Sequence, residues 1–147
     1  MFRPIEEKDR PIYLAMCRKF YDSDAVLEPV SDENFRKTFD LLLAGTPFAS
    51  AFVFEEGEEV VGYALLARTW SQEAGGEVIW IEEIYLEPSA RGKGYGSAFF
   101  RFLEEEYAPE AKRFRLEVEE ENEGAVSLYR KIGFEFFPYD QMKKDRA

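Results

Sequence analysis

The sequence predicts an α/β protein, of the α+β kind, with one mixed β-sheet of about seven strands and helices on both faces. Strand-like and helix-like apolar patterns follow the order β-α-α-β-β-β-α-β-α-β-β. A charged turn joins two strands as in an antiparallel hairpin, and two later helices connect strands by crossovers, which require parallel neighbours. At 147 residues the chain is long enough for one core, so we expect a single domain over residues 1–147.

The first half of the chain predicts a strand, two helices and a hairpin. The apolar side of the first helix comes from Ile12, Leu14-Ala15-Met16 and Phe20. The second helix begins at the N-cap residue Ser31. A charged turn at Gly57 separates the strands of the hairpin. The predicted elements are strand 2–5, helix 7–21, helix 31–45, and strands 48–54 and 59–70.

The second half predicts a long central strand at Val78–Leu86, which leads through a glycine-rich loop into a helix at Ser97–Tyr107. A further strand and helix repeat this crossover, and two short strands complete the sheet. The remaining predicted elements are strand 113–118, helix 122–132, and strands 134–137 and 139–144.

The composition limits the partners that the protein can have. Hydrophobic residues make up 46% of the chain and aromatic residues 16%, which predicts a globular protein with a substantial core. The 30 acidic and 19 basic residues give a formal charge of −11, which argues against nucleic acid or an anionic membrane as the main partner. The same charge suits a cationic substrate, although most glutamate runs are typical of solvated faces.

Histidine is missing from the sequence, so neither a Cys/His nucleophile nor a Ser/His/Asp triad can form. The single cysteine, Cys17, cannot form an internal disulfide and is interpreted as a small buried hydrophobe, and no metal is expected. Charges interrupt the first ten residues, and the longest uncharged stretch, 41–54, is shorter than the roughly 20 residues that span a bilayer. We therefore expect a cytoplasmic protein.

The glycine-rich loop Arg91–Gly96 predicts a site for a diphosphate. Glycine allows positive φ and close approach of the backbone, and the following helix offers unpaired N–H groups to an anion. A Walker loop is excluded by Glu87 and Gly94, and the dinucleotide fingerprint is excluded by Ser97 at its third glycine position. The simpler alternative is that the loop is only a turn.

A second motif places Asn122, Ala125 and Tyr129 on one face of a helix that Gly133 would end. The simpler alternative gives each of them an ordinary structural role. Asn122 would be the N-cap, Ala125 a packing residue and Tyr129 a core aromatic. Their shared face favours a common function.

With these two motifs the chain resembles the GNAT superfamily of acyl-CoA-dependent N-acetyltransferases. Arg91-x-x-Gly94-x-Gly96 is similar to the family's phosphate loop, and Asn122-x-x-Ala125-x-x-x-Tyr129 with the closing Gly133-Phe134 is similar to its second block. The segment Ile81–Leu86 is similar to that of the spermidine/spermine and thialysine acetyltransferase branch. The specific motifs cover Val78–Phe134, and before this only the order of elements matches.

The resemblance implies acetyl-CoA as cosubstrate. It also implies that two parallel strands, Val78–Leu86 and Arg113–Val118, splay apart and hold the pantetheine arm between them. The residues expected to bind acetyl-CoA are Ile84, Tyr85, Leu86, Arg91, Gly92, Lys93, Gly94, Tyr95, Gly96, Ser97, Asn122, Ala125 and Tyr129.

Acetyl transfer to an amine needs a base, because an alkylamine has a pKa near 10 and must lose a proton before it attacks. Strand alternation sends Glu82 and Glu83 to opposite faces, and the resemblance implies that Glu82 is the base. Glu83 either holds the cationic nitrogen of the substrate or faces water. The phenol of Tyr129 can protonate the leaving thiolate, and a backbone N–H near Ile84–Leu86 would stabilise the oxyanion.

The candidate residues for the acceptor amine lie at the end of the first helix and on the third strand. Tyr21, Asp22 and Asp24 combine an aromatic ring with carboxylates, which suits an ammonium group. Trp70 is a further candidate. The alternatives are a helix-end turn for the aspartates and a core position for Trp70, as for Tyr63.

The sequence is compatible with three functions. The first is an N-acetyltransferase that acts on a primary amine of a small molecule by direct transfer, without a covalent acyl-enzyme. The second is a protein N-acetyltransferase that acts on an N-terminal amine or a lysine. The third is a regulatory domain that binds acyl-CoA without catalysis, against which the presence of both Glu82 and Tyr129 speaks. A homodimer is left open.

Overall fold

The computed structural model describes residues 1–24 and 26–146, and these residues form one mixed sheet in the strand order β1-β2-β3-β4-β5. The first three pairings are antiparallel, and β4 pairs with β5 in parallel. The strands are β1 (Phe2–Pro4), β2 (Ala49–Glu56), β3 (Glu59–Ser71), β4 (Gly76–Leu86) and β5 (Ala111–Leu116).

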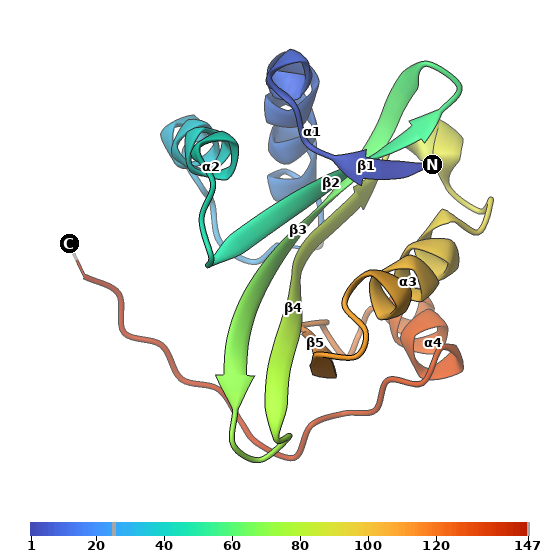
Figure 1. Ribbon diagram of the computed structural model, residues 1–147. Helices are drawn as coiled ribbons and strands as arrows, with labels where there is room; N and C mark the ends of the chain where they lie inside the picture. The colour runs from blue at the N-terminus through green and yellow to red at the C-terminus, as the bar shows by residue number, and fades with distance from the viewer. Residues whose placement is uncertain (25, 147) are drawn as a thin grey trace.

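Helices cover both faces of this sheet, as the sequence predicts (Figure 1). On one face lie α1 (Arg10–Tyr21), which follows the short 3-10 helix η1 (Glu7–Asp9), and α2 (Asp32–Ala44). On the other face lie α3 (Tyr95–Glu106) and α4 (Glu123–Lys131), and the short 3-10 helix η2 (Pro88–Ala90) precedes α3.

The prediction of about seven strands is wrong, because the sheet has five. Residues 134–137 and 139–144 have alternating or apolar patterns, yet they form no strand in the described part of the chain. Pro138 lies between them and has no N–H to give to a ladder. The Phe137 ring instead packs over the guanidinium of Arg115, 4.6 Å away. Figure 1 shows this segment running as an irregular chain past the end of the β3–β4 hairpin.

Two aromatic cores fix the helices to the sheet. The first lies under α3 and α4 and contains Phe54 and Phe99, whose ring centroids are 4.8 Å apart. The second lies under α1 and α2, where Tyr13 makes an edge contact with Tyr63 at 5.1 Å. Full burial of each such ring contributes roughly 1.5–3 kcal/mol, so both helix pairs are held firmly on β3 and β4.

A buried ion pair ties the start of the chain to the sheet. Asp9 is 2% exposed and accepts hydrogen bonds from Arg3 Nη1 at 2.8 Å and Nη2 at 2.9 Å, and from the Glu6 N–H at 2.8 Å. Arg3 Nε also lies 3.1 Å from a carboxylate oxygen of Glu55. The cluster therefore connects β1, the turn before α1, and β2.

Replacement of Asp9 by asparagine should lower the free energy of unfolding by about 3 kcal/mol, because it leaves the Arg3 guanidinium partly buried without its main counter-charge. Burial is the largest influence on the Asp9 pKa and raises it, but the hydrogen bonds from Arg3 and Glu6 hold this pKa below its ordinary value. A lowered carboxylate pKa contributes stability above the unfolded pKa of about 4 and loses it as the pH falls.

Urea unfolding of wild type and Asp9→Asn at pH 7 and pH 3 measures this effect, and the difference between the two proteins should shrink at the lower pH. Glu7→Gln is the matched control, since Glu7 forms a hydrogen-bonded ion pair with Arg10 on the surface. Equal stability of Asp9→Asn and Glu7→Gln at pH 7 would show that the buried pair is not an anchor.

Candidate active site

The pairing between β4 and β5 ends halfway along β4. The last paired residues are Ile81 and Leu116, after which β4 continues through residues 82–86 with a partner only on the β3 side. The ladder with β3 is irregular at the same place, because Leu65 pairs with Glu83 and Leu66 pairs with Ile81. Glu82 is therefore the extra residue of a β-bulge, which lies where one edge of the central strand becomes free.

The free edge presents backbone N–H groups. The Glu87 N–H bonds to the Val61 carbonyl on β3 at 2.8 Å. Because successive residues of a strand point their amides in opposite directions, those of Ile84 and Leu86 point away from β3. The side chains of Ile84 and Leu86 pack against the first core, whereas Tyr85 belongs to the second.

The Glu82 carboxylate lies at the bulge and is exposed to solvent. The surrounding protein still removes part of its hydration, and this raises the pKa of Glu82 above its ordinary value. The carboxylates of Glu117, just beyond the end of β5, and of Glu83 raise it further. Such a carboxylate is a better proton acceptor than a free glutamate.

Glu83 occupies a different environment, on the face covered by α1 and α2. Its two carboxylate oxygens accept hydrogen bonds from the hydroxyls of Tyr21 at 2.5 Å and Tyr63 at 2.7 Å. Burial raises the pKa of Glu83, and the two tyrosine hydrogen bonds partly offset this effect. The sequence analysis predicts opposite faces for the two glutamates from strand alternation, but the bulge at Glu82 interrupts this alternation. Their surroundings in the structure nevertheless differ.

Glu83 and Tyr21 line a cavity of about 390 Å3 between α1, α2 and the sheet. Aromatic rings and a carboxylate, which suit a small cationic molecule, meet there with polar side chains of α2, among them the cationic Lys37. The cavity is lined by Tyr13, Cys17, Tyr21, Val30, Asn34, Phe35, Lys37, Thr38, Leu65 and Glu83.

The glycine loop has the backbone that its sequence predicts. Gly92 and Gly94 have φ of 75° and 84°, in the left-handed region, and Gly94 is the N-cap of α3. A Cβ atom built at either glycine would meet no other atom within 4 Å, so both face open space. The amides of residues 95–97 have no hydrogen-bond partner in the part of the chain that the structure describes. These features fit a bound diphosphate.

Both basic side chains of the loop are already engaged. Arg91 donates from Nε to the Leu86 carbonyl at 2.9 Å, which holds the loop against the end of β4. Lys93 Nζ lies 3.1 Å from each carboxylate oxygen of Glu56, the last residue of β2. Tyr95 donates its hydroxyl to the same carboxylate at 2.7 Å. Sequence reasoning missed Glu56, which lies far from the loop along the chain.

The face of α4 combines a structural residue with a candidate acid. Asn122 caps the helix, since its Oδ1 accepts a hydrogen bond from the Ala125 N–H at 3.2 Å. The Tyr129 ring packs edge-on between Phe100 and Phe134, at 5.8 and 5.9 Å. Burial raises the pKa of Tyr129, and its hydroxyl has no hydrogen-bond partner among the described residues. The phenol therefore stays protonated and free to donate.

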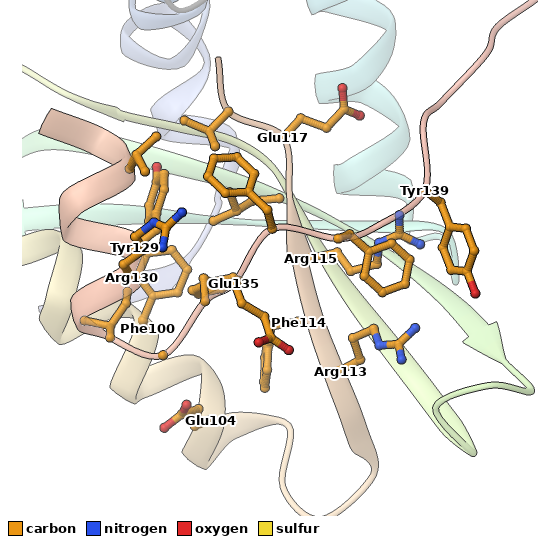
Figure 2. A pocket seen from close by; sticks show the side chains of 18 of the residues that line it. Phe100, Glu104, Arg113, Phe114, Arg115, Glu117, Tyr129, Arg130, Glu135 and Tyr139 are labelled. Carbon is orange, nitrogen blue, oxygen red and sulfur yellow. The ribbon is translucent and has the colours of Figure 1, made fainter. Parts of the chain in front are cut away.

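Tyr129 also borders a groove of about 530 Å3 along the outer edge of β5 (Figure 2). The groove runs between α4, β5 and the irregular segment after α4, and Glu117 lines it as well. Glu117 is also close enough to raise the pKa of Glu82, so it connects the surroundings of the two candidate catalytic groups. Of the predicted site residues, only Tyr129 lines this groove within the described chain.

The structure does not bring all the acceptor candidates together. Asp22 forms an ion pair with Arg18 at 3.3 Å, and Asp24 is exposed in the turn after α1. Trp70 is 73% exposed and pairs with Glu77 near the far end of β3, five residues beyond Leu65. Only Tyr21 contacts a predicted catalytic residue. The cavity residues from α2 were not predicted, because nothing in their local pattern distinguishes them from an ordinary apolar helix face.

Cys17 is buried, and burial raises the pKa of its thiol to about 12, in agreement with its interpretation as a small hydrophobe. Within residues 1–24 and 26–146 no group of three or more metal-ligating side chains is placed to hold a metal ion. In the same residues no helix is long and apolar enough to cross a membrane.

Residues 11–134 match the Acetyltransferase (GNAT) family, which confirms the resemblance seen in the two motifs. The chain belongs to the GNAT family of acetyltransferases.

Relatives within and around this family give more detail. Thialysine N-epsilon-acetyltransferase from Sus scrofa is 35% identical over 90% of this chain and 82% of its own length. A possible acetyltransferase from Clostridium difficile 630 has the same fold, with a TM-score of 0.84 at 18% identity, covering 100% of this chain and 97% of that protein. AAC(6')-Iy in complex with the bisubstrate analogue CoA-S-monomethyl-acetylneamine also shares the fold, with a TM-score of 0.76 at 14% identity, covering 100% and 98%.

Proposed function

We propose that this protein transfers the acetyl group of acetyl-CoA to a primary amine of a small molecule, by direct transfer within a ternary complex. The observation that carries the proposal is the position of Glu82. Its carboxylate, with a raised pKa, lies at a bulge where the edge of β4 becomes free, next to an unpaired row of N–H groups. A base and hydrogen-bond donors for a developing negative charge thus lie on one short segment.

Acetyl-CoA would be held by the open backbone of the glycine loop and the first turn of α3. The amides of residues 92–97 suit the diphosphate, because Gly92 and Gly94 leave their side of the loop free of side chains. When bound, acetyl-CoA supplies an acetyl thioester, which an amine can attack. The amides of Ile84 and Leu86 would then stabilise negative charge on the acetyl oxygen.

Glu82 would accept the proton that the ammonium group must lose, directly or through a water molecule. Glu83 would hold positive charge on the substrate, because its carboxylate is fixed by Tyr21 and Tyr63 and faces the cavity under α1 and α2. Tyr129 would donate its phenolic proton to the leaving thiolate. The ordinary pKa is near 10 for a phenol and near 8.5 for a thiol, so this transfer is uphill, and burial, which raises the pKa of Tyr129, makes it more so. Release of the products can complete it.

The size of the cavity beside Glu83 favours a small acceptor over a protein. Its volume of about 390 Å3 suits a ligand of metabolite size, and α2 closes one side of it. The similar proteins agree with this, since one is a thialysine N-epsilon-acetyltransferase and another binds the bisubstrate analogue CoA-S-monomethyl-acetylneamine. The cytoplasmic location and the homodimer stay predictions.

Thiol release from acetyl-CoA across two amine panels tests the proposal. We expect kcat/KM for the best small amine, among polyamines, amino acids and aminated metabolites, to exceed that for peptides with a free N-terminus or lysine by at least about tenfold. Background reaction of Cys17 with the thiol reagent should be low, because this thiol is buried and its pKa is raised to about 12. Faster turnover of peptides would favour a protein acetyltransferase, and binding without turnover would favour a regulatory domain.

Glu82→Gln keeps the shape of the side chain but removes the base. At pH 7 its kcat/KM for the amine should fall by about 10²-fold, with partial recovery at higher pH, where more of the free amine is already neutral. Glu83→Gln is the matched variant, and it should mainly raise KM for the amine while the pH profile keeps its shape. If the two variants exchange these behaviours, Glu83 is the base.

Tyr129→Phe should preserve the fold and the affinity for acetyl-CoA, because the ring keeps its contacts with Phe100 and Phe134 and the hydroxyl bonds to no described residue. Loss of the general acid should lower kcat by about 10²- to 10⁴-fold. Steady-state kinetics and calorimetric dissociation constants measure the two effects separately. A kcat within a few-fold of wild type would make Tyr129 a packing aromatic and leave water or the amine's own proton to quench the thiolate.

A further inference from the structure

The tip of the β2–β3 hairpin is strongly acidic and contacts the glycine loop. Residues 55–59 read Glu-Glu-Gly-Glu-Glu, and one of them, Glu56, reaches Lys93 and Tyr95. Lys93 Nζ is 3.1 Å from both carboxylate oxygens, and the Tyr95 hydroxyl is 2.7 Å from one of them. The Glu56 carboxylate is thus already bound to the Lys93 ammonium and the Tyr95 hydroxyl, two groups of the loop that can bind an anion.

Glu56 carries its negative charge in this contact at neutral pH. The Tyr95 hydroxyl and then the Lys93 ammonium hold the pKa of Glu56 below its ordinary value, so that Glu56 is ionised. The groups are also accessible, since the side chains of Lys93 and Glu56 are 50% and 43% exposed. An exposed ion pair of this kind is weak and opens readily, so it can exchange with a stronger anion.

The other basic side chain of the loop, that of Arg91, is held by a contact of its own. The guanidinium of Arg91 is bound to the Leu86 carbonyl and stacks near the Tyr85 ring at 5.7 Å. A phosphate that takes a contact from Lys93 or from the Tyr95 hydroxyl, in addition to backbone amides, must therefore displace Glu56.

We propose that Glu56 competes with the phosphate groups of acyl-CoA for Lys93 and the Tyr95 hydroxyl, and so lowers the affinity of the loop for the cosubstrate. This inference rests on the proposed function, because it requires that the glycine loop binds the phosphates. It makes Glu56 a determinant of affinity located outside the motifs of the loop and of α4. The effect depends on phosphate charge and is absent for a ligand that carries no phosphate.

Calorimetry with wild type, Glu56→Gln and Glu58→Gln tests this inference. Glu58→Gln is a matched control, because it removes the same charge from the same hairpin, two residues further along, while no ion pair of Glu58 occurs in the described chain. At low ionic strength Glu56→Gln should bind acetyl-CoA about three- to tenfold more tightly than wild type and Glu58→Gln less than twofold, and the gain should shrink in 0.5 M salt. Unchanged thermal unfolding confirms that the variants are folded.

Two further measurements define the mechanism. S-acetylpantetheine, which has no phosphate, should bind all three proteins equally, and in a Lys93→Met background the gain from Glu56→Gln should fall below about twofold. Weaker or unchanged acetyl-CoA binding by Glu56→Gln would overturn the inference while the proposed function stands. If wild type bound acetyl-CoA no more tightly than S-acetylpantetheine, the phosphate loop itself would be refuted together with this inference.

Discussion

The end of the β4–β5 ladder at Ile81 and Leu116 is the constraint on which the rest of the candidate site depends. A strand in the middle of a sheet normally has both edges paired, and β4 loses one partner halfway along its length. The bulge at Glu82 lies at this point and changes which side chains face each layer. Unpaired amides and an ionisable side chain therefore come together without any long loop, on a strand held rigidly by β3.

The two aromatic cores keep this arrangement in place and separate its tasks. The core under α3 and α4 supports the glycine loop and the Tyr129 ring, whereas the core under α1 and α2 supports Tyr21 and the cavity beside Glu83. Under the proposed function, cosubstrate and acceptor would approach β4 from opposite faces, and direct transfer would require that their reacting groups meet at this strand. Rigid packing on both faces suits a site whose groups must keep fixed positions.

Electrostatics distinguishes groups that look alike in the sequence. Glu82 and Glu83 are neighbours, yet one is exposed beside another carboxylate and the other is enclosed by two tyrosine hydroxyls. Glu56 belongs to an acidic run that is typical of a solvated turn, and its position beside Lys93 gives it a specific contact. The formal charge of −11 therefore does not reveal that individual carboxylates have quite different environments and contacts.

The sequence by itself determined the features that depend on local chemistry. The glycine loop, the cap at Asn122 and the helix periods are short-range properties, so α3 was predicted at 97–107 and found at 95–106. Tertiary structure alone decided which strands pair, because pairing depends on partners distant in the chain. The local patterns at 134–144 therefore predict two strands that do not form. For the same reason the sequence predicts neither the bulge at Glu82 nor the contact between Glu56 and Lys93.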